Sequence, residues 1–369
     1  MSRLRELAAI ALVAAAAATQ LPLPGWNAGA HYALVRSLVH GTPQIDKHLN
    51  QSGDIAYVDG HFYAAKSPGL AFASVPVYLA FSAAGAVPDT YVTAQGPPGA
   101  RQVSERAIWQ VNLFVIAAFF ALLLLIRVVV DEMFPGAGLA AALLLGLGTM
   151  LLPFATLYFA HDLSAALGFG AFAMLLRERR RASLRLVIGA GVVAGLAVFA
   201  ELPTAIIGAC LGMYACTDAP RLRRAATYLG GFIAGLMPLA VYNAWAFGSP
   251  LRNGYSSAVK ELGTNGHDVI GANGQGFFGL TYPHPRAAFD LLFSTRGLFV
   301  LTPVTLVATA GLVLLWRRDA RREALLIAGV GLVMLVYNSA YYLPFGGHVP
   351  GPRFLVPLLP FLALPLAAA

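Results

Sequence analysis

The stretch from Gly41 to Tyr78 collects the side chains best suited to chemistry. It reads GTPQIDKHLNQSGDIAYVDGHFYAAKSPGLAFASVPVY, within a chain of 369 residues that is 58% hydrophobic and 11% charged. Its ionisable and aromatic residues include Asp46, Lys47, His48, Asp54, Tyr57, Asp59, His61, Tyr63 and Lys66. Apolar runs flank the stretch, and ionisable groups beside a bilayer are costly unless they are paired or used. We therefore interpret it as a candidate functional site.

The chemistry that these residues could perform is group transfer from a phosphate. A carboxylate such as Asp46 or Asp54 can serve as general base toward an acceptor hydroxyl. Lys66 can bind a phosphate as a point charge and support its departure. Arg353, in GGHVPGPR, is a second phosphate candidate. The alternatives are ordinary solvated loop residues, attraction of Lys66 to anionic headgroups, and interfacial anchoring by Arg353.

Several polar residues elsewhere complete the candidate site. His161 and Asp162 in FAHDLS and Glu201 in AELPT could orient a ligand, but capping of a helix start is the favoured interpretation. Aromatic and amide side chains suit many sugars. The predicted substrate contacts are Asp59, His61, Tyr63, His161, Asp162, Glu201, Tyr242, Asn243, Tyr255 and His348.

Composition places these residues in a membrane protein. The mean hydropathy is +0.69, and apolar runs of roughly 17 to 25 residues recur along the chain. The formal charge of +8 lies mostly in short basic clusters between these runs, an arrangement that orients membrane helices. We find no zinc-ligand spacing, GxGxxG, P-loop, GxSxG or Asp-x-Asp motif. The sequence thus predicts no metal, no cofactor and no nucleic-acid partner.

The elements expected to position the site are membrane helices. We predict an all-α, polytopic protein with about ten transmembrane helices in one domain, 1–369. The spans are an N-terminal run, which could instead be a signal peptide, and 106–130, 137–159, 162–176, 186–200, 203–216, 226–246, 297–316, 324–342 and 353–369. Residues 27–104 form a large first outer loop with interfacial helices, including an apolar piece interrupted by Pro76. Residues 247–296 form a second, irregular outer loop.

Charge sets the expected orientation. Alternation from a cytoplasmic N-terminus puts 15 of the 25 Lys and Arg residues in short cytoplasmic connections, as the positive-inside rule requires. All eight histidines then lie outside. The predicted location is the inner (plasma) membrane, with the site on its outer or periplasmic side. The last apolar run stops at Ala369 without a polar tail, which suggests a truncated C-terminus.

Three motifs carry a resemblance to a known family. GHFYAAKSPGLAF resembles the first-loop G-x-x-Y-x-x-K-x-P stretch of GT-C type membrane glycosyltransferases, in the group of protein O-mannosyltransferases and lipid A aminoarabinose transferases. YNAWAFGSPLRNGY and GGHVPGPRFLVPLLPFL resemble an uncharacterised bacterial branch of that group. The resemblance covers nearly the whole chain. It implies a multi-spanning enzyme that uses a polyprenyl-phosphate sugar and inverts the anomeric carbon, with Lys66 at the position of the lysine that contacts the lipid phosphate.

The sequence departs from this family at the expected general base. The family has an acidic residue at the start of the first loop, where this chain reads WNAGAHY, and Asn27 cannot act as a base. We expect Asp46 to replace it, with Asp54 second. The predicted function is transfer of a hexosyl or pentosyl group from a polyprenyl phosphate to a glycan, lipid or protein acceptor. The alternatives are a transporter or flippase for a lipid-linked substrate, disfavoured by the lack of clear repeats and mid-span charges, and an inactive GT-C-like subunit.

Overall fold

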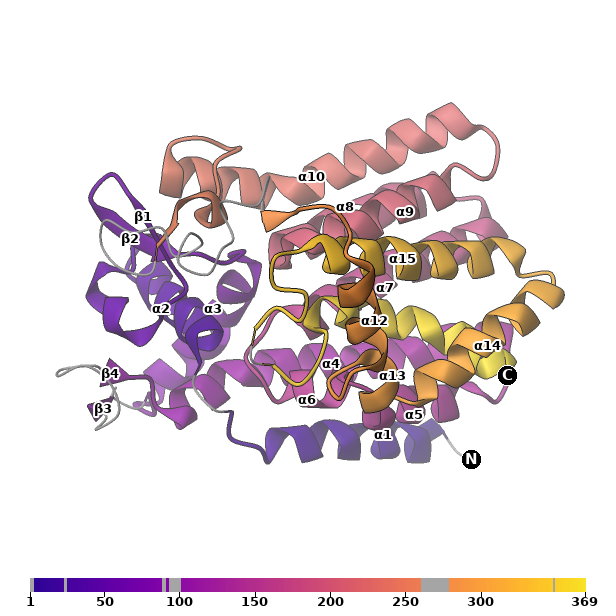
Figure 1. Cartoon of the computed structure of the whole chain (residues 1–369), viewed down its shortest axis with the longest axis horizontal. Coiled ribbons are helices and arrows are strands. Elements are labelled where there is room, and N and C mark those ends of the chain that lie inside the picture. Colours follow the sequence, from indigo (N-terminus) through magenta and orange to yellow (C-terminus); the bar gives the residue numbers. More distant parts are fainter. Residues whose placement is uncertain (1–2, 23–24, 88–90, 93–100, 260–278, 348) are drawn as a thin grey trace.

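The computed structural model describes residues 3–22, 25–87, 91–92, 101–259, 279–347 and 349–369, and it is mostly helical (Figure 1). The main helices are α1 (Arg3–Ala18), α2 (Trp26–Val39), α3 (Gly69–Ala83), α4 (Glu105–Met133), α5 (Gly138–Gly148), α6 (Leu151–Ala155), α7 (His161–Arg181), α8 (Leu184–Ala200), α9 (Ala205–Ala215), α10 (Arg221–Phe247), α12 (Pro285–Phe293), α13 (Leu298–Leu301), α14 (Val304–Arg317), α15 (Arg321–Ala340) and α16 (Ala363–Ala368). The 3-10 segments are η1 (Asp46–Gln51), η2 (Leu202–Thr204), η3 (Gly254–Ser257) and η6 (Arg353–Leu362).

The predicted apolar segments form helices, but several are short or broken. By length and composition, α4, α10 and α15 can each cross a membrane, and α12–α13 with α14 makes a fourth candidate span bent by 93°. Proline interrupts other segments, because it lacks a backbone N–H and clashes with the preceding turn. Pro203 lies in η2, Pro303 follows α13, and Pro357 and Pro360 lie in η6. The predicted number of ten spans is therefore not confirmed.

Glycine allows α8 and α10 to pack closely. A Cβ atom at Gly191 would lie 2.2 Å from the carbonyl oxygen of Tyr228, and one at Gly235 would lie 2.1 Å from that of Val192. Gly195 and Gly231 make similar approaches to the facing backbone. Small residues at i and i+4 permit such contacts between membrane helices. The two helices therefore pack tightly together, and Glu201 follows the last residue of α8.

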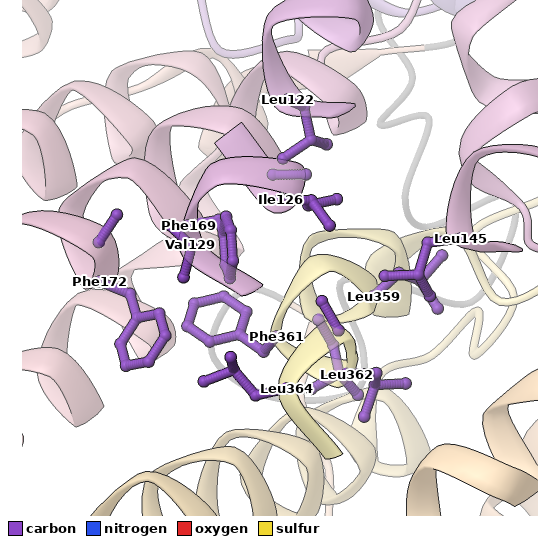
Figure 2. Packing of buried hydrophobic residues seen from close by; sticks show 14 of the residues in the cluster. Leu122, Ile126, Val129, Leu145, Phe169, Phe172, Leu359, Phe361, Leu362 and Leu364 are labelled. Atoms are coloured by element: carbon purple, nitrogen blue, oxygen red, sulfur yellow. The ribbon is translucent and has the colours of Figure 1, made fainter. Parts of the chain in front are cut away.

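The C-terminal segment fills the centre of the bundle. Figure 2 shows Phe361 and Leu362 of η6 among side chains of α4, α5 and α7. The Phe361 ring lies 5.6 Å from that of Phe169 and 5.5 Å from that of Phe172, centroid to centroid. All four residues are buried. Because η6 starts at Arg353, this core also fixes the position of that arginine.

Ion pairs join the helix ends at the end of the bundle that holds both termini (Figure 1). Arg224 at the start of α10 donates to both carboxylate oxygens of Glu178 near the end of α7. Both residues are buried. Arg127 of α4 pairs with Glu6 of α1, and further pairs link α7 with the end of α4 and the start of α15. The basic helix ends thus gather on one side, in line with the charge pattern, although the cytoplasmic orientation itself stays a prediction.

The first-loop elements lie at the opposite end of the bundle (Figure 1). The strands β1 (Ile55–Val58) and β2 (His61–Ala64) form an antiparallel hairpin, and β5 (Ala258–Val259) pairs with β1. A second pair joins β3 (Tyr91–Val92) and β4 (Arg101–Gln102). The all-α prediction is therefore wrong in this detail. The 15-residue α3 is about 22 Å long at 1.5 Å per residue, less than a hydrocarbon core of about 30 Å, so the predicted interfacial position remains consistent with its length.

The α8–α10 contact gives a stability prediction. A Cβ atom at Gly231 would lie 2.2 Å from the backbone oxygen of Ile188, whereas one at Gly230 would have no neighbour within 4 Å. Gly231→Ala should lower the free energy of unfolding by about 1–3 kcal/mol through overpacking. Gly230→Ala is the matched control and should be neutral or stabilising by up to about 1 kcal/mol, because alanine favours helix. Thermal unfolding in detergent measures both, and equal effects would contradict the close contact.

Candidate functional site

The hairpin places Asp54 beside Lys66. Asp59 and Gly60 occupy its two-residue turn with φ of 51° and 89°, as an Asp-Gly type I′ turn requires. The resulting register pairs Ile55 with Ala64, and the Ala65 N–H donates to the backbone oxygen of Asp54 at 3.0 Å. The residues just outside the two strands are therefore neighbours. The Lys66 Nζ lies 3.0 Å from the Asp54 Oδ2.

The segment after Lys66 docks on the junction of α8 and η2. The Leu202 N–H donates to the Ser67 Oγ at 3.3 Å. A Cβ atom at Gly69 would lie 2.7 Å from the Ala200 backbone, so glycine is needed for this approach. Pro68 fixes the backbone just before α3 starts. The Lys-Ser-Pro-Gly sequence thus holds the first loop against the residue next to Glu201.

Lys66 lies in a largely buried position between charged and aromatic groups. Its side chain is 12% exposed, and its Nζ lies 5.9 Å from the centroid of the Tyr255 ring. Burial lowers the pKa of Lys66, because it removes water from the ammonium; the Asp54 carboxylate opposes this shift, Arg353 adds to it, and Glu201 opposes it more weakly. The effect of Arg353 on Lys66 indicates that these two predicted phosphate ligands belong to one cluster. We call Asp54, Lys66, His161, Glu201, Tyr255 and Arg353 the polar cluster.

Arg353 contributes a second cation at the start of η6. Its guanidinium carbon lies 4.7 Å from the centroid of the Phe354 ring and 5.9 Å from that of Phe159. Its Nε is buried without a hydrogen-bond partner, and no described carboxylate lies within ion-pair distance of it. A Cβ atom at Gly346, whose φ is 77°, would lie 2.2 Å from this Nε. The absence of a side chain at Gly346 therefore makes room for the arginine.

His161 and Glu201 form a buried pair at the starts and ends of neighbouring helices. The His161 Nδ1 lies 2.6 Å from the Glu201 Oε2, which also accepts from the Ser164 Oγ at 3.1 Å. His161 is 3% exposed and Glu201 is 8% exposed. The His161 Nε2 has no partner among the described residues. Phe154, Phe159 and Phe354 surround the imidazole ring.

His161, Asp162 and Glu201 lie at helix starts, as the cap interpretation predicted, but their side chains make no capping hydrogen bond. No side chain caps α7 or η2. Asp162 is fully buried, and neither of its carboxylate oxygens has a partner in the described part of the chain. The reason is tertiary: the first turn of α7 faces α8 and η6 rather than water, so its polar groups interact across helices.

Asp46, Asp59 and His61 lie apart from Lys66, at the turn end of the hairpin, where Asp46 is the first residue of η1. Asp46 accepts from the Phe62 N–H at 2.7 Å, and its other oxygen lies 2.8 Å from the His61 Nδ1. The Asp46 and His61 side chains are 40% and 47% exposed. Asp59 is exposed in the turn. These contacts hold the hairpin on η1, and among the first-loop aspartates it is Asp54 that contacts Lys66.

The predicted aromatic and amide contacts divide between packing and the cluster. Tyr63 is buried with its ring 5.1 Å from that of Phe247, and Tyr242 is buried against the same ring at 6.1 Å. The Asn243 Nδ2 donates to the backbone oxygen of Pro250. Tyr255 alone of this group lies in the polar cluster, where burial and then Glu201 raise its pKa to about 12. His348 lies outside the described residues, as does the segment 260–278 of the second outer loop.

Sequence reasoning missed several residues around the cluster. They are His31, Ser67, Ser164, Tyr337, Tyr341 and Tyr342. Tyr337 and Tyr341 of YNSAYYLPF stack on one another, and the Tyr341 ring meets the Phe354 ring edge to face at 5.3 Å. The density of aromatic residues directly before the GPRFL motif was the available signal. For the hairpin, the Asp-Gly dipeptide between two alternating runs was the signal.

The cluster can hold an anion and accept a proton. Asp54 and Glu201 supply two carboxylates, and Lys66 and Arg353 supply two cations. Within the described residues, no three His, Cys, Asp or Glu side chains gather as a metal site. Burial is the main cause of the lowered pKa of Lys66, and repulsion by Arg353 adds to it. An entering phosphate would relieve that repulsion.

The fold is that of GT-C membrane glycosyltransferases. The structure resembles ArnT from Cupriavidus metallidurans bound to undecaprenyl phosphate, with a TM-score of 0.63, 16% identity, and coverage of 99% of this chain and 59% of that protein. It also resembles the archaeal oligosaccharyltransferase AglB from Archaeoglobus fulgidus in complex with an inhibitory peptide and a dolichol-phosphate, with a TM-score of 0.56, 14% identity, and coverage of 99% and 49%. The chain thus spans about half to three-fifths of their lengths. No family model and no curated protein matches the sequence.

Buried His31 predicts acid sensitivity. Burial and then the Lys66 charge lower its pKa to about 3 from an ordinary 6.5. Between these values the unfolded state binds more protons, so the His31 contribution to stability should be lost as the pH falls from 6.5 toward 3. His31→Phe should flatten the fall in unfolding temperature with acid. His48, whose pKa burial and Arg36 lower to about 4, keeps part of the slope.

The control for this prediction is His40→Gln, because His40 is exposed at the end of the same helix. It should leave the pH dependence of the unfolding temperature unchanged. A His31→Phe variant with the wild-type pH dependence would show that His31 is not held neutral by the fold.

Proposed function

We propose that the protein is an inverting glycosyltransferase that moves a sugar from a polyprenyl phosphate to an acceptor at the outer face of the membrane. The carrying observation is the polar cluster, in which the largely buried Lys66 lies near enough to Arg353 to interact with it electrostatically and Arg353 has no described carboxylate partner. The cluster lies at the end of the bundle opposite the basic helix ends. The resemblance of the fold to ArnT bound to undecaprenyl phosphate and to AglB with dolichol-phosphate supports a lipid-phosphate ligand.

In this proposal each charged side chain has a role. Lys66 and Arg353 bind the donor phosphate and stabilise its negative charge as it leaves the anomeric carbon. Asp54 accepts the proton of the acceptor hydroxyl while that oxygen bonds to the same carbon from the opposite face. Its position beside Lys66 favours it over Asp46, whose two oxygens already serve the hairpin.

The remaining cluster residues orient the sugar and acceptor. Glu201 and Ser164 fix the imidazole of His161, leaving its Nε2 for a ligand hydroxyl. The Tyr255 ring provides an apolar face beside Lys66 of the kind that stacks on sugars. The sugar, hexosyl or pentosyl, and the acceptor, whether glycan, lipid or protein, remain to be found by experiment. The inactive-subunit alternative rests on Asn27, which stands where the resembled family has an acidic residue and cannot act as a base.

Lipid retention tests the donor site. Wild-type protein purified in mild detergent should retain a polyprenyl phosphate detectable by mass spectrometry, and Lys66→Ala should lose it because the buried ammonium is a direct phosphate ligand. The matched control is Lys47→Ala, which removes an exposed lysine of the same loop and should retain the lipid. Equal amounts of ordinary phospholipid in all three proteins, without polyprenyl phosphate, would remove the donor assignment.

Transfer activity tests the base. Asp54→Asn should reduce transfer by about 10²–10⁴-fold, the usual contribution of a general base, whereas Asp46→Asn should retain most activity with a less stable hairpin. The measurement is sugar transfer from the co-purified donor to added acceptor extract. Collapse in Asp46→Asn with activity kept in Asp54→Asn would reassign the base to Asp46, and no transfer by any protein that retains donor would favour the inactive subunit.

A further inference from the structure

The contact between Asp54 and Lys66 is too short for the reaction in which both take part. An inverting displacement places the base and the leaving phosphate on opposite faces of the sugar ring. In inverting glycosidases the two carboxyl groups that flank the sugar are about 6.5–9.5 Å apart. The Asp54 Oδ2 and the Lys66 Nζ are 3.0 Å apart, which leaves no room for a sugar between the base and a phosphate on Lys66.

The surroundings of Lys66 supply a reason for the contact to open. Charged and titratable groups face it from every packed element: Asp54 before β1, Tyr255 from η3, Glu201 from the end of α8, Arg353 from η6 and His31 from α2. Of the described carboxylates, Asp54 is the one within ion-pair distance of Lys66. Of the two cations, Lys66 thus has one contacting carboxylate and Arg353 has none among the described residues. A phosphate offers both cations more charge and more acceptor oxygens than Asp54 does.

We propose that the Lys66–Asp54 ion pair is a resting-state latch, which the donor phosphate opens by taking Lys66 from Asp54. The inference rests on the proposed function and adds the order of events at that site. In the resting protein Asp54 is engaged by an ammonium and is not available to a hydroxyl. After the exchange Lys66 and Arg353 hold the phosphate, and Asp54 is free to face the acceptor.

The chemical step then balances without another reactant. The acceptor O–H proton passes to the Asp54 carboxylate as the oxygen bonds to the anomeric carbon. The bond from that carbon to the phosphate oxygen breaks, and its electron pair leaves with the polyprenyl phosphate on Lys66 and Arg353. Because the base is released only when the donor is bound, an acceptor that arrives first meets no free base.

The exchange requires only side-chain rotation. The backbone of the pair is held by the hydrogen bond from the Ala65 N–H to the Asp54 oxygen and by the docking of Ser67 on Leu202. Lys66 carries a flexible four-carbon side chain, whereas Asp54 has a short one that is 28% exposed. The backbone of the two residues therefore stays in place while the lysine side chain moves.

In the latch, Asp54 competes with the donor phosphate for Lys66. Removing the Asp54 charge should therefore increase the affinity for the phosphate. The probe is undecaprenyl phosphate, titrated against the purified full chain in detergent micelles by calorimetry. Asp54→Asn should bind it about 3- to 10-fold more tightly than wild type, the scale of one partly exposed ion pair. Asp54→Glu, which keeps the charge, should return toward wild-type affinity. Asp290→Asn removes a carboxylate that pairs with Arg286 outside the cluster and should change nothing.

The outcomes separate the latch from the proposed function. Weaker binding by Lys66→Ala together with tighter binding by Asp54→Asn supports both. Weaker binding by Lys66→Ala with equal or weaker binding by Asp54→Asn keeps the phosphate site and overturns the latch. Binding that is absent, or unaffected in Lys66→Ala, overturns the proposed function. An unchanged unfolding temperature of the Asp54→Asn protein excludes misfolding. If Asp54→Asn is unstable, the affinity of Asp54→Glu for undecaprenyl phosphate decides whether the latch exists.

Discussion

The ammonium group of Lys66 is the constraint on which the candidate site depends. A buried cation is tolerated only where neighbouring groups compensate its lost hydration. Here the compensation comes from distant parts of the chain: Asp54 before the hairpin, Tyr255 from the second outer loop and Glu201 from the end of α8. These three groups surround the lysine only when the first loop, the second outer loop and α8 pack together. The docking of the first loop on α8 is therefore inseparable from the chemistry of the site.

The two ends of the bundle differ in how completely their charged and polar side chains are paired. At the end that holds both termini, arginines and carboxylates are matched closely, as Arg224 with Glu178 and Arg127 with Glu6, and these pairs fix helix ends relative to one another. At the other end, polar groups are incompletely matched. The buried Nε of Arg353 and both carboxyl oxygens of Asp162 have no hydrogen-bond partner among the described residues. An unsatisfied buried polar group costs stability, and such groups cluster at functional sites.

The likeness to ArnT and AglB at 14–16% identity shows how little of this fold depends on particular side chains. Close helix contacts at glycines and a core of phenylalanine and leucine can be made by many sequences. The chemistry allows less freedom. At the start of the first loop, Asn27 stands where the resembled family has an acidic residue, and the hairpin register holds Asp54 beside Lys66, the proposed phosphate ligand. In the proposed function, the base has therefore moved along the first loop.

The sequence by itself determined the membrane class, the positions of most helices, the polar first loop and the two cations of the proposed phosphate site. These follow from local properties: hydropathy, periodicity, and the Lys-Ser-Pro-Gly and Gly-Pro-Arg motifs. Only the tertiary structure decided that Asp54 rather than Asp46 contacts Lys66, that His161 pairs with Glu201 instead of capping a helix, and that His31 and the tyrosines near Arg353 join the site. Those contacts join residues tens to hundreds of positions apart. Their partners are set by hairpin register and helix packing, which no local pattern encodes.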